Sequence, residues 1–145
     1  MITSNWRMTY DPAGTPLVIL DFQDKIDEEP RFGFQTGVDV VPLLASDLPL
    51  LRATGNGVFD ISFRRLLSQS SDTLAREEVL EWLVNNAARG KAPLQIEILD
   101  GTYATYQFSA AVIVQHETQR IITSPFCRYA ISFQITAAGL TRTLL

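Results

Sequence analysis

The sequence is poor in the residues that build disulfides and metal sites. It contains one cysteine, Cys127, and one histidine, His116. A single cysteine cannot form an intramolecular disulfide, so a disulfide-stapled scaffold is excluded and a reducing compartment is expected. Zinc sites need several histidine, cysteine or carboxylate ligands at set spacings, so no zinc site within one chain is expected.

Motifs of nucleotide-binding and acyl-transfer enzymes are also missing. Gly55-Asn56-Gly57 has two glycines but lacks the Lys-Ser/Thr pair of a phosphate loop and does not open a helix directly. No Gly-x-Ser-x-Gly nucleophile elbow occurs. We therefore predict no catalytic, cofactor-binding or metal-binding residues, no cofactor, and no enzymatic activity.

Long apolar runs and a surplus of basic residues are absent as well. No stretch approaches the roughly 20 apolar residues of a membrane span, and residues 1–7 lack the basic and then apolar run of a signal peptide. The net charge is −4, whereas binding to a phosphate backbone needs clustered Lys and Arg. We expect a protein made in a cytoplasm, without a membrane partner, in which Arg64-Arg65 is ordinary surface or interface charge.

The composition is that of a folded chain. Hydrophobic residues make up 46% of the sequence and charged residues 19%, the opposite balance to a disordered segment. A length of 145 residues is ordinary for one domain, and neither repeats nor a low-complexity linker divide it. We expect a single β-rich domain over residues 1–145.

The first third of the chain is predicted to hold short strands. Residues 6–10 alternate in polarity, residues 17–22 form an apolar run, and residues 38–41 are a further candidate. A turn is predicted at Asp11-Pro12-Ala13-Gly14. Prolines make parts of this third irregular or confine them to sheet edges: Pro30, Pro42 and Pro49.

A second turn is predicted at Gly55-Asn56-Gly57. Phe59, Ile61 and Phe63 follow it and alternate with polar residues. A period of two is typical of a half-buried strand.

A helix is predicted over residues 73–89. Ser71, Asp72 and Thr73 offer N-cap side chains, and Gly90 is a natural stop. Trp82 is expected to seal an edge of the core rather than to mark a ligand site. The stripe predicted to face the core consists of Val79, Leu80, Leu83, Val84 and Ala87.

Three sequential strands are predicted after the helix, joined as an antiparallel meander. A three-residue turn at Asp100-Gly101-Thr102 pairs Ile96 with Tyr106 and keeps the apolar faces together, whereas a two-residue turn mixes them. The predicted apolar faces are Leu94, Ile96 and Ile98; then Tyr106, Phe108, Ala110, Val112 and Val114; then Tyr129, Ile131, Phe133, Ile135 and Ala137.

The second hairpin of this meander has its own predicted register. Pairing Val114 with Tyr129 joins the last two strands by a loop over about residues 117–125. It also sets His116 opposite Cys127.

A sheet with one apolar face must cover that face, and one helix is too small for it. The predicted fold is therefore mainly β (α+β): an antiparallel β-sandwich or partly open barrel, with a second sheet from the N-terminal strands and one flanking helix at about 73–89.

Two groups of residues are candidates for chemistry. A Cys-His pair can be a nucleophile with its base, but no Asp or Asn that would orient His116 is evident, so we favour a loop-end histidine beside a small apolar cysteine. Oxygen-rich loops can hold calcium, but the acidic spacing here does not match an EF-hand. We favour a solvated loop, or one that pairs with a neighbouring subunit, for the acidic residues Asp21, Asp24, Asp27, Glu28 and Glu29.

The order of elements resembles the tail-tube fold. A strand at residues 58–64, a helix at 73–89, a strand with a tight turn at 94–102 and a long closing hairpin at 103–137 follow one another as in phage tail-tube proteins, distal tail proteins and the tube proteins of contractile injection systems. The segments that carry the resemblance are Leu74-Ala75-Arg76-Glu77-Glu78-Val79-Leu80-Glu81-Trp82-Leu83, Leu94-Gln95-Ile96-Glu97-Ile98-Leu99-Asp100-Gly101 and Arg128-Tyr129-Ala130-Ile131-Ser132-Phe133-Gln134-Ile135.

The resemblance implies a structural subunit of a phage-type tail, located in the virion. Such subunits form a homo-oligomeric ring, usually hexameric, whose sheets join into one barrel, and other tail proteins are partners. DNA would only pass through the lumen, without specific binding. Ring closure would satisfy the unpaired edges of long strands, and the apolar ends Met1-Ile2 and Leu144-Leu145 could dock on neighbours.

Two alternatives stay open. One is a head-tail joining or tail terminator protein of another fold. The other is a non-viral β-barrel binding module, although the polar side of the last strands argues for exposure rather than a closed apolar pocket.

Overall fold

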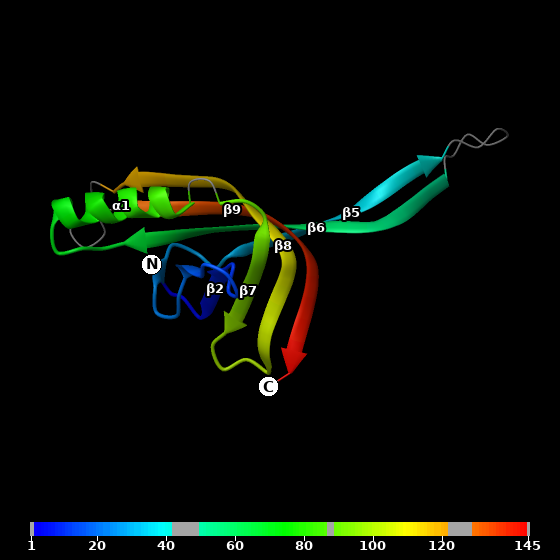
Figure 1. Cartoon of the computed structure of the whole chain (residues 1–145), viewed down its shortest axis with the longest axis horizontal. Coiled ribbons are helices and arrows are strands. Elements are labelled where there is room, and N and C mark those ends of the chain that lie inside the picture. The colour runs from blue at the N-terminus through cyan, green and yellow to red at the C-terminus, as the bar shows by residue number, and fades with distance from the viewer. Residues whose placement is uncertain (1, 42–49, 87–88, 122–128, 145) are drawn as a thin grey trace.

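The computed structural model describes residues 2–41, 50–86, 89–121 and 129–144, with the backbone alone for residues 37–41 and 50–56. These residues form one nine-stranded antiparallel sheet and one helix (Figure 1). The strands are β1 Ile2–Thr3, β2 Trp6–Tyr10, β3 Leu17–Leu20, β4 Lys25–Ile26, β5 Arg31–Val41, β6 Leu50–Leu67, β7 Ala92–Ile98, β8 Tyr103–Arg120 and β9 Tyr129–Leu144; the helix is α1 Asp72–Asn86.

The sheet curls towards a barrel that stays open. Its strand order is β1-β4-β6-β9-β8-β7-β2-β3, with β5 also paired to β6. Strands β1 and β2 lie near opposite ends of this order but are separated only by Ser4-Asn5. The buried Ser4 donates its backbone N–H to the Asp24 carbonyl (2.7 Å) and accepts from the Gln23 N–H (3.0 Å). The N-terminal segment therefore links the two sides of the curled sheet.

The predicted fold class is confirmed, mainly antiparallel β with one flanking helix. The N-terminal strands do not build a separate second sheet, however. They extend the same sheet at both ends, since β4 pairs with β6 and β2 pairs with β7. Because the sheet curls, the apolar faces of its two sides pack against each other. One sheet therefore buries most of its apolar face without a second sheet.

The β7–β8 hairpin has the predicted register. Leu94 pairs with Phe108 and Ile96 with Tyr106. Asp100 takes a left-handed conformation (φ 59°), and the Gly101 N–H donates to the Ile98 carbonyl at 3.1 Å. This register is predictable because a slip by one residue would turn every apolar side chain to the wrong face.

The predicted register of the β8–β9 hairpin is wrong. Strand β8 continues to Arg120, and His116 pairs with Phe133 instead of Cys127, which lies outside the described residues. Register shifts at Ala92/Leu94 and Ile113/Gln115 mark irregularities in the pairing of β8. Each bulge adds a residue and reverses the alternation, so Ala111 is buried while Val112 and Val114 are exposed.

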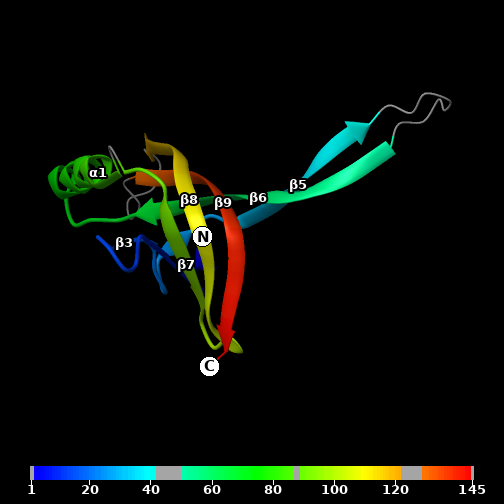
Figure 2. The ribbon, with the colours of Figure 1, turned by 45° about the vertical axis from the view of Figure 1, so that its right-hand side comes forward.

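The β5–β6 hairpin projects from the sheet as an arm, defined as residues 36–41 and 50–57, on the far side of the molecule from α1 (Figures 1 and 2). The turn predicted at Gly55-Asn56-Gly57 is wrong, because these residues lie inside β6. Thr36 pairs with Gly57 and Val38 with Ala53, so residues 54–56 lie opposite a single residue. The glycines accompany this irregularity in the ladder rather than a reversal of the chain.

Helix α1 begins near the predicted residue but turns a different face to the core. The Ser71 hydroxyl accepts the Leu74 N–H at 3.2 Å, as an N-cap does. The buried residues are Ala75, Val79 and Trp82, spaced i, i+4, i+7. Of the predicted stripe only Val79 is confirmed as buried: Leu80, Leu83 and Val84 are exposed, and Ala87 lies outside the described residues. Burial of the large Trp82 indole stabilises the fold more than burial of the smaller aliphatic side chains would.

The core fills the curl of the sheet and is closed at one end by α1. Trp82 and His116 both pack against Phe133 of β9, with ring centroids 5.7 and 4.7 Å away. The predicted inward face of β9 is confirmed for its central residues, since Ile131, Phe133 and Ile135 are buried. No helix of the described residues lies over the opposite end of β8 and β9, around Phe108 and Leu140.

Candidate assembly interface

Strands β6 and β9 part at the pair Phe59 and Ala137, and this leaves an open edge. Their ladder runs from Leu67–Tyr129 to Phe59–Ala137. Beyond it, β6 enters the arm, while β9 continues beside β8 as far as the Tyr103–Leu144 pair. Among the strands that the structure describes, none pairs with the other edge of β9 over residues 138–144. We call this segment the β9 edge.

The β9 edge is exposed on both of its faces as well as along its side. Every residue from Gly139 to Leu144 is exposed, including the apolar Leu140 (43%) and Leu144 (68%). A long edge strand with apolar side chains is a template for pairing with another chain, and soluble proteins normally blunt such edges. Its backbone N–H and C=O groups are available for a neighbour.

An apolar groove opens next to the β9 edge, inside the uncovered end of the curled sheet. Its volume is about 220 Å³, and aromatic and aliphatic side chains line it. Six strands contribute to it, so it forms only when the sheet curls. The lining residues, which define the aromatic groove, are Trp6, Phe32, Phe59, Ile96, Ile98, Tyr106, Phe108 and Leu140.

Ring contacts hold the wall of the aromatic groove at the root of the arm. Phe32 lies 5.3 Å from Trp6, and Phe59 lies 5.1 Å from Phe108, centroid to centroid. Phe34 extends the wall by its contact with Phe59 at 4.8 Å. Phe32 is 44% and Phe34 57% exposed. Contiguous exposed aromatic surface of this kind marks interaction sites more often than isolated apolar side chains do.

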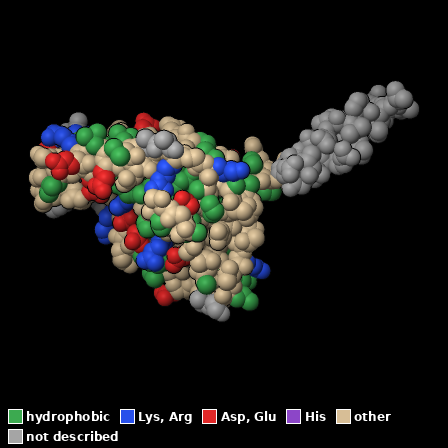
Figure 3. All heavy atoms as spheres, viewed as in Figure 1, with side chains coloured by type: hydrophobic (Ala, Val, Ile, Leu, Met, Phe, Trp, Pro, Cys, Tyr) green, Lys and Arg blue, Asp and Glu red, His purple; other side chains and the backbone are tan. Residues whose placement is uncertain are grey.

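The acidic residues Asp21, Asp24, Asp27, Glu28 and Glu29 face basic or hydrogen-bonding partners within the chain. Asp21 binds Arg7 of β2 at 2.7 Å, whereas Asp24 and Asp27 bind Arg65 and Arg64 of β6 at 3.3 and 2.6 Å. These ion pairs therefore join the β2 side of the curled sheet to its β6 side. Figure 3 shows acidic and basic side chains next to one another on this face below α1.

Two further contacts complete the partners of this acidic segment. Glu28 binds Arg31 at 3.0 Å, and Glu29 accepts the indole N–H of Trp6 at 2.6 Å. Within the described ranges, no group of three or more His, Cys, Asp or Glu residues is placed to hold a metal ion.

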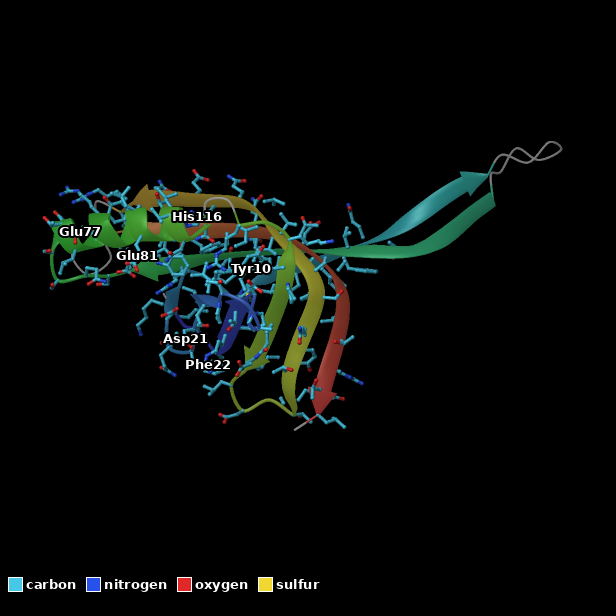
Figure 4. The ribbon with its side chains drawn as sticks, in the orientation of Figure 1. Tyr10, Asp21, Phe22, Glu77, Glu81 and His116 are labelled. Carbon is cyan, nitrogen blue, oxygen red and sulfur yellow. The ribbon has the colours of Figure 1, made fainter. Side chains whose placement is uncertain are left out.

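Asp21 shows the electrostatic consequence of these contacts. Burial opposes its ionisation, but hydrogen bonds from Arg7 and from the Phe22 N–H outweigh burial, so the pKa of Asp21 is lowered. The Arg7 guanidinium also lies over the Phe22 ring at 4.4 Å. Asp21 and Phe22 lie below α1 and β6, on the side away from the arm (Figure 4).

His116 lies against the core without a hydrogen-bond partner. Both of its ring nitrogens are buried, and no partner lies within reach in the part of the chain that the structure describes. Burial lowers the pKa of His116. A nucleophile-activating histidine needs a group that orients it and a nucleophile within reach, and the residue paired with His116 is Phe133.

Comparisons with known proteins were made by sequence and by structure. The sequence matches no family profile and no curated protein. By structure, the chain is similar to a protein from the tail of an empty gene transfer agent particle refined with helical C6 symmetry, with TM-score 0.59, 16% identity and 96% of each chain covered. The chain has a phage tail-tube-like fold.

Two components of the anti-feeding prophage share this tail-tube-like fold. One belongs to its sixfold-symmetrised baseplate (TM-score 0.54, 10% identity, covering 98% of this chain and 94% of that one). The other belongs to its tube-terminating cap (TM-score 0.53, 12% identity, covering 100% and 91%). The element order predicted this resemblance over roughly residues 50–139, and the structural similarity extends it over nearly the whole chain.

Sequence reasoning anticipated unpaired strand edges but did not locate the β9 edge or the aromatic groove. One signal was present: Phe32 and Phe34 flank a glycine shortly before Pro42, and such exposed aromatic alternation could have been noted. The remaining groove residues are scattered from Trp6 to Leu140, and nothing local in the sequence brings them together.

In the described part of the chain, α1 is too short and too polar to cross a membrane.

Proposed function

We propose that this protein is a structural subunit of a phage-type tail, a tail tube, distal tail or related adaptor protein, and that it assembles into homo-oligomeric rings. The observation that supports this most directly is the β9 edge, an unpaired strand exposed on both faces beside an aromatic groove. Pairing with a strand of the next subunit would satisfy its backbone groups and cover Leu140 and Leu144. The symmetric assemblies that contain the similar structures support the same proposal.

The proposal includes hexameric rings, other tail proteins as partners, a location in the virion tail, and synthesis in the host cytoplasm without any membrane association. The chain is proposed to act as one domain without enzymatic activity or cofactor. DNA would pass through the lumen without specific contacts. The net charge of −4 supports this last point, since like charge weakens adhesion to phosphate.

Purified full-length protein tests the proposal. Sedimentation velocity and negative-stain microscopy are expected to show closed rings or stacked rings. Hydrogen exchange is expected to slow on assembly at those amides of residues 138–144 that point away from β8. A protein that stays monomeric at high concentration, with unchanged exchange at the β9 edge, would refute it.

Termination of a tube is a second candidate role for the same fold. The similarity to the tube-terminating cap of the anti-feeding prophage supports it. A terminator would form single rings that do not stack, whereas a tube subunit would form stacks, and microscopy separates the two.

A further inference from the structure

The outward face of α1 carries an apolar patch that no other described segment covers. Leu80, Leu83 and Val84 are 61%, 42% and 74% exposed, and together they define the outer helix patch. Leu80 and Val84 are one helical turn apart and lie on the same face. Within the described chain, Leu80 and Val84 point away from Ala75, Val79 and Trp82, which enter the core, whereas Leu83 lies one turn beyond Val79 at the border of the buried face.

Carboxylates border the outer helix patch. Glu77 and Glu81 are also one turn apart, both are exposed, and neither makes an ion pair with another described residue. They lie on α1, at the end of the molecule away from the arm (Figure 4). The patch is thus apolar with an acidic border, and it calls for a partner that is apolar with a basic border.

The mouth of the aromatic groove meets that description. In the β8–β9 ladder Phe108 pairs with Leu140 and Tyr106 with Arg142. Arg142 therefore stands on the groove side of β9, two pairs beyond Leu140. Its guanidinium lies 4.3 Å from the centroid of Tyr103. Arg142 is exposed and has no carboxylate partner in the described residues.

We propose that the outer helix patch of one copy docks over the aromatic groove of a second copy, with Glu77 and Glu81 facing Arg142. A groove of about 220 Å³ admits one or two aliphatic side chains rather than a helix. Leu80 and Val84 would therefore enter it while the α1 backbone stays outside. This inference rests on the proposed function, because it supplies a second contact between subunits of the same assembly.

The direction of this contact follows from the fold. The groove lies at the Tyr106–Arg142 end of the β8–β9 ladder, whereas α1 lies beside the other end, near Phe133. Pairing at the β9 edge extends the sheet sideways, but docking of α1 over the groove extends the assembly along the strands. The two patches are different surfaces, so the contact is heterologous, and because it acts along the strands it would repeat as an open stack. Edge pairing would close a ring, and helix docking would join one ring to the next.

A charge exchange in full-length protein tests the proposal. Both Glu81→Arg and Arg142→Glu are exposed changes, which should leave the fold intact by circular dichroism. Each should raise the protein concentration at which rings stack by about tenfold, because like charges then meet across the contact. The double variant Glu81→Arg/Arg142→Glu should restore most of the stacking, as in a double-mutant cycle. Glu117→Arg, an exposed carboxylate outside both patches, is the matched control and should stack as wild type does.

The apolar part of the contact has its own pair of variants. Val84→Asp should reduce stacking, whereas Leu99→Asp, at an exposed position in the β7–β8 turn, should not. Rings that stack equally in all variants, or single exchanges that the double variant does not rescue, would overturn the helix–groove contact while leaving ring formation intact. Absence of any ring in the wild type would instead reject the proposed function together with this contact.

Discussion

Gly139 of β9 lies directly against Ser109 of β8. A β-carbon at position 139 would come within 2.0 Å of the Ser109 Oγ, and Gly139 has a φ of +76°, which side-chain-bearing residues rarely adopt. Gly139 lies two residues beyond Ala137, which forms the last β6–β9 pair with Phe59. Glycine is therefore required at the point where β9 leaves β6 and becomes the open edge.

The first prediction concerns this glycine. Gly139→Ala should lower the free energy of unfolding by about 1–3 kcal/mol, because the left-handed conformation is strained and Ser109 must move. Thermal and urea denaturation of the unassembled protein measure the change. Adding Ser109→Ala should recover only part of the loss, since the side-chain clash disappears while the backbone strain remains. Full recovery would show that the backbone angle is unimportant.

The second prediction concerns pH. The pKa of His116 is lowered in the folded state from 6.5, because burial disfavours the charged ring. The unfolded chain therefore binds the proton more readily, so the free energy of unfolding should fall as pH drops through about 6.5 and level off below the folded-state pKa. Urea denaturation between pH 5 and pH 7.5 (about the range in which histidine titrates) measures this. His116→Phe should flatten the dependence in that range; an unchanged slope would assign it to other groups.

The third prediction compares two ion pairs of the acidic segment. Asp24 faces Arg65, whose side chain is only 16% exposed and lies 5.0 Å from the Trp82 ring. Asp24→Ala would leave that cation poorly compensated and remove the acceptor of the Asp21 N–H, at a cost of about 2–4 kcal/mol.

Asp27→Ala is the matched control for this prediction. Asp27 and Arg64 are 37% and 39% exposed, so solvent screens their attraction. Its loss should cost less than about 1 kcal/mol. Equal losses in the two variants would mean that burial does not distinguish these pairs.

The fourth prediction tests the orientation of α1. Trp82 is 8% exposed and packs on Phe133, so Trp82→Ala should cost about 3–5 kcal/mol in the unassembled protein. Val84 is 74% exposed, so Val84→Ala should change stability by no more than about 0.5 kcal/mol. Chemical denaturation of both variants gives the comparison. A larger loss for Val84→Ala would restore the face predicted from the sequence.

The two hairpins after α1 differ in how far the sequence determines their register. The β7–β8 register was predictable because one turn and two alternating faces leave a single consistent pairing of Ile96 with Tyr106. The β8–β9 register was not, because bulges near Ala92/Leu94 and Ile113/Gln115 reverse the alternation without a local signal.

Helix α1 shows the same division within one element. Its start at Ser71-Asp72 follows from local capping. Its buried face did not follow from the pattern, because apolar residues occur on every side of the helix, from Leu74 to Val84, and no narrow stripe singles out one of them. Packing against Phe133 selected the face that contains Trp82.

The sequence by itself determined the mainly β class, the single predicted helix, most strand positions and the order of elements that resembles a tail tube, because each depends on neighbours within a few residues. Only the tertiary structure decided that the N-terminal strands join the same sheet, that β9 leaves β6 after Ala137, and that residues from Trp6 to Leu140 meet in one apolar groove. These features depend on how far the sheet curls and where its bulges fall, and both are set by packing between residues that are distant along the chain.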